Sequence, residues 1–169
     1  MTCTHHEFDE LVKPQSLIIN PLHELACCLF FFGSTQVSAI RKKIPHHLGK
    51  YSTFEVLTAF LWRCRTIALS PDPEDQVRSI FMNKVRAILN PPLPKGYYGN
   101  ADAISLAVAT AGELCENPLE YALELVRKAK TNVNDEYIRS FIDPVVSKGR
   151  PPLCNPSLCQ TQHVWGLEA

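Results

Sequence analysis

The sequence predicts an α/β chain in which helices flank a mixed sheet. Amphipathic helical patterns occur at 34–44, 51–69 and 118–130, and apolar strand-like stretches occur at 76–89 and 101–114. Proline-rich or glycine-rich breaks separate these stretches. The chain has 169 residues, 46% of them hydrophobic, which is enough for a sizeable core. We expect one domain, or one domain and part of another.

The first third of the chain contains a connecting segment, a strand and a helix. Residues 1–24 are polar and are interrupted by two prolines, which is typical of a linker. The run "LACCLFFF" at 25–32 is short and continuously apolar, which predicts a strand buried on both faces. The stretch 34–44 predicts a helix that ends at the following proline. Its inward face carries Val37, Ile40 and Ile44.

The stretch 51–69 carries the strongest helical pattern in the chain. Ser52 and Glu55 have the spacing of a capping box, in which a hydroxyl and a carboxylate bind free amides of the first turn. The helix is expected to be buried over most of its circumference. Its predicted inward stripe contains Leu57, Phe60 or Leu61, Cys64 and Ala68, with Cys64 as a small core residue.

The second half alternates strands, loops and helices. Strands are predicted through 80–82 and 104–108, separated by the proline-rich and glycine-rich loop 90–100. Pro118 suits the first position of a helix that runs to about Lys130. That helix should bury Leu119, Ala122, Leu125, Val126 and Ala129.

The last 36 residues contain one more helix and then lose all periodicity. A shorter helix is predicted to start at Asn134 and to end at Pro144. Residues 151–169 have several prolines and no pattern, so we expect an irregular tail.

Charge and cysteine content favour some classes of protein over others. The 17 basic and 17 acidic residues leave no basic excess, so a nucleic-acid partner is not expected. The longest apolar run has eight residues, too few for a membrane span, and the first residues do not resemble a secretory signal. Seven cysteines without a Cys-x-x-Cys pair indicate reduced thiols in a cytoplasmic protein.

The stretch "CTHHEFDE" at 3–10 raises the question of catalysis. His5-x-x-x-Asp9 has the spacing that many acyl-transferring enzymes use around a histidine base. The alternative interpretation is a polar linker. A metal site is not expected, because the chain shows no second cluster of ligands.

Three blocks, "STFEVLTAFLWRCRT", "LNPPLPKGYYGN" and "NPLEYALELVRKAK", resemble the plant BAHD acyltransferases, in particular the branch of alcohol acyltransferases and benzyl alcohol O-benzoyltransferases. The resemblance runs from about Thr2 to Arg150. It implies acyl transfer from acyl-CoA to an alcohol and part of a chloramphenicol-acetyltransferase-like domain. It divides the chain into an inter-domain linker (1–24), the first part of the second domain (25–150) and a divergent tail (151–169).

The resemblance also implies that both signature motifs of the family are missing. The family's His-x-x-x-Asp motif belongs upstream of this region, so "CTHHEFDE" matches its spacing but not its position. The Asp-Phe-Gly-Trp-Gly motif should follow Arg150, where "HVWGLEA" shares only Trp165 and Gly166. We therefore expect no catalytic residue here and a truncated gene product, inactive on its own.

The resemblance implies a few ligand-binding residues. Ser52 and Thr53 would meet a CoA phosphate at a helix N-terminus, or serve only as the helix cap. Arg86 would meet a phosphate or lie in solvent, and Lys84 stands where the branch has asparagine. The stretch Tyr97–Asn100 resembles the family's Tyr-Phe-Gly-Asn motif, where we expect Gly99 and Asn100 to shape the loop.

The sequence therefore predicts an incomplete O-acyltransferase whose partners are acyl-CoA and a small alcohol, with no bound cofactor. Such a chain would expose an apolar domain interface and could associate through it. A non-catalytic CoA-binding or interaction protein is the alternative. A third hypothesis is a small esterase or transferase that uses His5 and Asp9.

Overall fold

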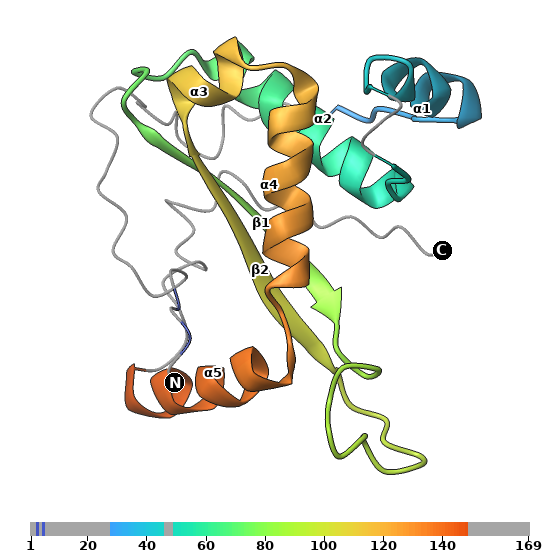
Figure 1. Cartoon of the computed structure of the whole chain (residues 1–169), viewed down its shortest axis with the longest axis vertical. Coiled ribbons are helices and arrows are strands. Elements are labelled where there is room, and N and C mark those ends of the chain that lie inside the picture. The colour runs from blue at the N-terminus through green and yellow to red at the C-terminus, as the bar shows by residue number, and fades with distance from the viewer. Residues whose placement is uncertain (1–2, 4, 6–27, 46–48, 149–169) are drawn as a thin grey trace. The chain divides into compact units, whose positions relative to one another are not determined.

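The computed structural model describes residues 3, 5, 28–45 and 49–148 (Figure 1). The α/β class is confirmed, and the two strands of this part form an antiparallel pair. None of the described helices is both long and apolar enough to cross a membrane. In chain order the elements are α1 (Ser34–Arg41), α2 (Thr53–Leu69), β1 (Gln76–Lys84), β2 (Asp102–Thr110), α3 (Ala111–Glu116), α4 (Leu119–Thr131) and α5 (Asp135–Lys148).

The chain forms two compact units. Of the described residues, the helical unit contains 28–45, 49–77 and 108–126. The strand unit contains residues 3 and 5 together with 78–107 and 127–148. The predicted division into a linker, a partial second domain and a tail remains a prediction, because most of the linker and the whole tail lie outside the described residues.

Helix α2 is the centre of the helical unit and packs against both α1 and α3. Its capping box forms as predicted, because Ser52 and Glu55 bind each other's backbone amides. The prediction that Cys64 is a core residue was wrong, and this thiol is exposed. Cys64 lies about 200° around the helix axis from Trp62, which is 3% exposed and marks the buried face. The buried residues of α2 are Glu55, Val56, Leu57, Thr58, Ala59, Trp62 and Thr66.

Helix α3 is short and was not predicted. Thr110 and Glu113 form a second capping box at its start, so the Thr-x-x-Glu spacing was the signal in the sequence. At its C-terminal end the Arg63 guanidinium group donates to the carbonyl oxygens of Leu114 (3.1 Å), Cys115 (2.8 Å) and Asn117 (3.2 Å). One side chain of α2 therefore binds the free carbonyls that end α3.

The strand unit is held by a buried polar contact. The Asn83 side-chain amide donates to the Ser105 hydroxyl oxygen at 2.8 Å and to the Lys130 carbonyl oxygen at 3.2 Å. This contact joins β1, β2 and the last turn of α4. Both predicted strands are confirmed, but the fully buried side of β2 carries Ser105, Ala107 and Ala109 and not the larger residues between them.

Helix α4 follows its prediction closely, whereas two other predictions failed. Residues 28–32 are not a strand, because none of the described segments pairs with them, and residues 25–27 lie outside the described part. Helix α5 passes through Pro144 and continues to Lys148, so the proline does not end it. A proline inside a helix removes one backbone hydrogen bond but does not always stop the helix. The predicted first helix is confirmed as α1, although it ends at Arg41 and not at Pro45. Ile40 in α1 and Ile44 just after it are buried, as predicted.

Candidate functional site

The three residues expected to bind CoA lie in different units. Ser52 and Thr53 stand together at the start of α2 in the helical unit. Arg86 follows β1 in the strand unit.

Ser52 is engaged by its own helix. Its backbone amide donates to the Glu55 carboxylate at 2.7 Å, and its hydroxyl group donates to the same oxygen at 2.8 Å. The Ser52 hydroxyl oxygen in turn accepts from the Glu55 amide at 3.2 Å. A carboxylate thus already occupies part of the N-terminal end of α2, where the helix dipole favours negative charge. The helix-cap role of Ser52 is confirmed.

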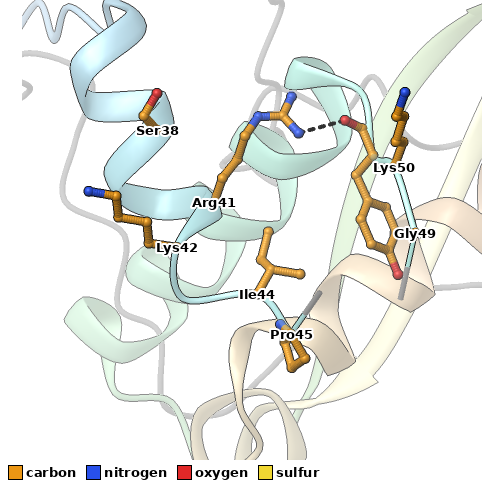
Figure 2. A pocket seen from close by; sticks show the side chains of 8 residues that line it. Ser38, Arg41, Lys42, Ile44, Pro45, Gly49 and Lys50 are labelled. Atoms are coloured by element: carbon orange, nitrogen blue, oxygen red, sulfur yellow. Dashed lines mark hydrogen bonds between the residues drawn. The ribbon is translucent and has the colours of Figure 1, made fainter. Parts of the chain in front are cut away.

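A cationic pocket lies between α1 and the segment that enters α2 (Figure 2). Thr53 contacts one of its lining residues, Arg41. The Arg41 guanidinium group reaches from α1 and donates to the Tyr51 carbonyl oxygen at 2.7 Å and to the Thr53 hydroxyl oxygen at 3.2 Å. The cavity holds about 350 Å³. It is lined by Ser38, Arg41, Lys42, Ile44, Pro45, Gly49, Lys50 and Tyr51.

A second hollow of about 360 Å³ adjoins this pocket along α1. Ser38 and Lys42 line both hollows. The other residues around the second hollow are Ser34, Thr35 and Ala39, so it is rich in hydroxyl groups. Three cations and several hydroxyl donors, without a carboxylate among the lining residues, make this region suitable for phosphoryl groups. The basic residues at the end of α1 and the hydroxyls before them are visible in the sequence, but nothing in the sequence shows that the segment 49–51 lies beside them.

Arg86 binds its own loop. Its guanidinium group donates to the carbonyl oxygens of Tyr97 (3.1 Å) and Gly99 (2.7 Å) and lies 5.5 Å from the centroid of the Tyr97 ring. A Cβ atom at Gly99 would lie 2.6 Å from the Tyr97 hydroxyl oxygen, so a larger residue there would require the Tyr97 ring to move. Tyr98, by contrast, is fully exposed. These contacts support the loop-shaping interpretation of Gly99.

The same loop is fastened at its other end by α5. The Asn90 amide donates to the Asp135 carboxylate at 2.9 Å, and the Arg139 guanidinium group binds both the Asn90 carbonyl oxygen and Asp135, the latter at 2.7 Å. Arg139, and then the Asn90 amide, hold the pKa of Asp135 below its ordinary value. Asp135 in turn raises the pKa of Arg139. Sequence reasoning missed this contact because its partners are about 45 residues apart.

His5 has a structural environment in the strand unit. Its Nε2 atom is 2.8 Å from the Ser140 hydroxyl oxygen, and its ring lies 4.6 Å from the Tyr137 ring and 5.6 Å from the Phe141 ring. The Ser140 hydroxyl donates to the Tyr137 carbonyl oxygen at 3.0 Å, so its oxygen can accept from a protonated Nε2. This is the hydrogen-bond direction opposite to that of a serine nucleophile and its base. Asp9, His23, His46 and His47 lie outside the described residues.

Within the described residues, no group of three or more histidine, cysteine, aspartate or glutamate side chains is placed to hold a metal ion. The cations and hydroxyls that line the two hollows offer the binding of anionic groups.

Residues 13–161 match the Transferase family, which is the family of BAHD acyltransferases. The chain belongs to this family. Benzyl alcohol O-benzoyltransferase from Nicotiana tabacum is 56% identical over 151 residues, and the protein of the same name from Petunia hybrida is 54% identical over 151. The (Z)-3-hexen-1-ol acetyltransferase of Arabidopsis thaliana is 44% identical over 152 residues. Each match covers 89% of this chain and 33% of the relative. This BAHD-family chain therefore spans about a third of the length of its curated relatives.

Solved structures agree on the fold. Vinorine synthase matches with a TM-score of 0.52 at 15% identity, over 68% of this chain and 27% of that one. TRI101 of F. sporotrichioides, in complex with coenzyme A and T-2, matches with a TM-score of 0.56 at 16% identity, over 74% of this chain and 31% of that one. The BAHD-family chain thus has part of the acyltransferase fold, as the sequence predicted.

Proposed function

We propose that the chain is part of an acyl-CoA-dependent O-acyltransferase that acylates a small alcohol. The observation that carries this proposal is the family match across 13–161, together with relatives that are named as acyltransferases of alcohols. In this reaction the alcohol oxygen attacks the thioester carbonyl carbon. The carbon–sulfur bond breaks, an ester forms, and the alcohol proton leaves with the CoA thiol. The relatives named above come from plants, which favours a role in plant secondary metabolism.

The contribution of this chain to the reaction is the binding of CoA. CoA carries phosphate groups, and the cationic pocket offers Arg41, Lys42 and Lys50 beside the start of α2. Thr53 stands at the rim of this pocket through its contact with Arg41. Ser52 can bind a phosphate only by sharing the groups that now bind Glu55. We therefore assign the phosphate contact mainly to the three cations and Thr53, and keep Ser52 as the cap beside them.

Arg86 contributes in a different way. Two of its donors hold the carbonyl oxygens of the loop 90–100, so its first role is to fix the loop that carries Tyr98. Its side chain is exposed, and a phosphate contact stays a prediction.

The general base of the reaction is expected elsewhere. His5 is bound to Ser140 in the strand unit, and the spacing match with Asp9 gains no support from this contact. Loss of general-base assistance lowers a rate by about 10²–10⁴-fold. We therefore expect the chain alone to be inactive, or nearly so. A cytoplasmic location stays part of the proposal.

The experiment that tests the proposal measures CoA binding and acyl transfer separately. Calorimetric titration of the chain with CoA should give saturable binding, and Lys42→Glu should weaken it about tenfold or more, because a charge-assisted contact to phosphate is worth about 1.5–3 kcal/mol. Lys43→Glu is the matched control, since Lys43 is the exposed neighbour of Lys42 and does not line the pocket. Equal loss in both variants would overturn the assignment of the pocket.

The transfer assay uses benzoyl-CoA with benzyl alcohol and the tobacco relative as reference. The chain alone should fall below that reference by at least two orders of magnitude. If the chain alone shows turnover and His5→Ala abolishes it, the hypothesis of a small esterase or transferase that uses His5 and Asp9 would be supported instead.

A non-catalytic CoA-binding protein is the second candidate. It is favoured by one observation: the residues lining the cationic pocket all belong to a single unit of this chain. Saturable CoA binding with no turnover in any acyltransferase assembly would support this candidate over the first.

A further inference from the structure

Arg41 differs from the two lysines of the cationic pocket because its donors are already bound. One terminal nitrogen of its guanidinium group donates to the Tyr51 carbonyl oxygen at 2.7 Å, and the other donates to the Thr53 hydroxyl oxygen at 3.2 Å. Figure 2 shows the side chain reaching from α1 to the segment that enters α2. Lys42 and Lys50 line the same pocket and are exposed. Arg41 therefore has a role in the pocket besides its charge.

The first of these contacts joins the two walls of the pocket. Residues 49–51 form one wall, and the end of α1 with the residues after it forms the other. Tyr51 lies two residues before α2 begins, so its carbonyl oxygen is outside the hydrogen-bond ladder of that helix. The bond from Arg41 satisfies this oxygen and fixes Lys50 relative to Lys42, although neither lysine takes part in it. The spacing of the two lysine charges therefore depends on Arg41.

The second contact sets the direction of the Thr53 hydroxyl group. Its oxygen accepts from Arg41, so its proton is left to donate to another acceptor. The backbone amide of Thr53 belongs to the first turn of α2, whose amides have no acceptor within the helix ladder. An anion beside Thr53 would thus receive an O–H donor and an N–H donor next to the charges of the pocket. A phosphate suits this set, because its oxygens accept several hydrogen bonds at once.

We propose that Arg41 is a positioning residue of the CoA site, which holds residues 50–53 in the arrangement that receives a phosphate. This inference rests on the proposed binding of CoA and deepens it. All three cations supply charge to the site, whereas the two bonds of Arg41 supply its geometry. A planar guanidinium group binds two acceptors in fixed directions, but an ammonium group is a point charge without that geometry. Arg41→Lys therefore keeps the charge and should lose the positioning.

The test is calorimetric titration of the chain with CoA at several salt concentrations. Arg41→Lys should weaken binding about tenfold, because a bond from a charged donor is worth about 1.5–3 kcal/mol. The salt dependence of the dissociation constant should stay unchanged in this variant, since the charge remains. Lys42→Gln should weaken binding and also flatten the salt dependence, because it removes a charge from the pocket. Lys43→Arg is the matched control, since Lys43 does not line the pocket.

Thr53 supplies the second part of the test. Thr53→Val keeps the shape of the side chain but removes the hydroxyl group, so it should weaken the binding of CoA. Thr53→Ser keeps a hydroxyl group and should bind much more tightly than Thr53→Val. Because Arg41 acts partly through Thr53, the losses of Arg41→Lys and Thr53→Val should not add in the double variant. Circular dichroism should show the helix content of the native chain in every variant.

The outcomes separate this inference from the proposed function. If Arg41→Lys binds CoA as tightly as the native chain does, Arg41 acts by charge alone, and the inference is wrong while the CoA site stands. Fully additive losses in the double variant would overturn the coupling to Thr53. If the native chain shows no saturable binding of CoA, the proposed function of the pocket is rejected, and the positioning role is rejected with it.

Discussion

Ser52 fixes the start of α2 through both its amide and its hydroxyl group. Both groups are bonded to Glu55, which is only 8% exposed. A ligand that uses the same groups must compete with this carboxylate. We therefore assign the phosphate contact to the neighbouring cationic side chains. The main contribution of Ser52 is to the stability of α2.

Ser52→Ala should lower the free energy of unfolding by about 1 kcal/mol, because the hydroxyl of a helix cap contributes about 0.5–2 kcal/mol. Chemical denaturation followed by circular dichroism measures this change. Ser52→Thr keeps a capping hydroxyl and should lose much less. Equal losses in the two variants would contradict the capping role.

Arg86→Ala should loosen the loop 90–100 without unfolding the strands. The substitution removes two hydrogen bonds to loop carbonyls, at Tyr97 and Gly99. Hydrogen exchange of the loop amides should become faster, by about tenfold, since a hydrogen bond to a charged group contributes about 1.5–3 kcal/mol. Lys84→Ala is the matched control, because Lys84 is exposed nearby on β1. If the loop amides exchange at the same rate in the two variants, Arg86 does not hold the loop.

At the scale of residues, local motifs were predictable and distant contacts were not. The Ser52–Glu55 box spans one helical turn, so spacing alone reveals it. Arg86 has its partners 11 and 13 residues further along, and Arg139 binds a carbonyl 49 residues away. Such contacts depend on how the chain returns on itself, which spacing does not encode. Cys64 was misplaced because α2 is apolar on several sides, so more than one face fitted the pattern.

Strands β1 and β2 and the end of α4 are joined through one buried side chain, Asn83. Asn83→Ala should cost about 1–3 kcal/mol in the free energy of unfolding, because the Ser105 hydroxyl and the Lys130 carbonyl oxygen lose a buried partner. Thermal or chemical unfolding measures the loss. Met82→Ala on the same strand is the control, since Met82 is 58% exposed and should change stability far less.

The contact between α5 and the loop 90–100 should weaken in acid. The pKa of Asp135 is lowered in the folded chain, chiefly by Arg139. Its stabilising contribution is therefore complete above the ordinary value of 3.8 and is lost as the pH falls through the lower folded value. Hydrogen exchange at Asn90 should accelerate in that acidic range. Asp135→Asn should remove this pH dependence, and an unchanged acid response in that variant would contradict it.

At the scale of elements, periodicity identified the long helices and the two strands. It missed α3, which has six residues and too few turns to show a period. A strand was also predicted at residues 25–32. Composition shows that a segment suits a buried strand, but it does not show whether a neighbouring strand is present to pair with it. Helix α5 was predicted to end at Pro144, but it continues through this residue to Lys148.

The whole chain combines a formal charge of zero at pH 7 with an exposed apolar run at residues 29–31. Near-zero net charge favours association, so the solubility of the isolated chain should be lowest near pH 7 and higher at pH 9, where the net charge is negative. Turbidity against pH measures this. Leu29→Asp should raise the solubility at pH 7 more than Val146→Asp does, although each adds one charge. Equal gains would show that added charge alone is responsible.

At the scale of the molecule, the family and fold were predictable because three long sequence blocks occur in the right order. The cationic pocket was not predictable, because the fold brings a separate segment, 49–51, beside α1 to form it. The sequence singled out Thr53, which lies at the rim, but not Lys42 or Lys50.

The contact of Arg63 with the end of α3 has a consequence for the order of folding. A six-residue helix is too short to persist alone in water. Its last carbonyls bind a guanidinium group that is in place only once α2 has formed. Helix α3 is therefore a late and dependent element of the helical unit. Any event that opens the middle of α2 should therefore release α3 as well.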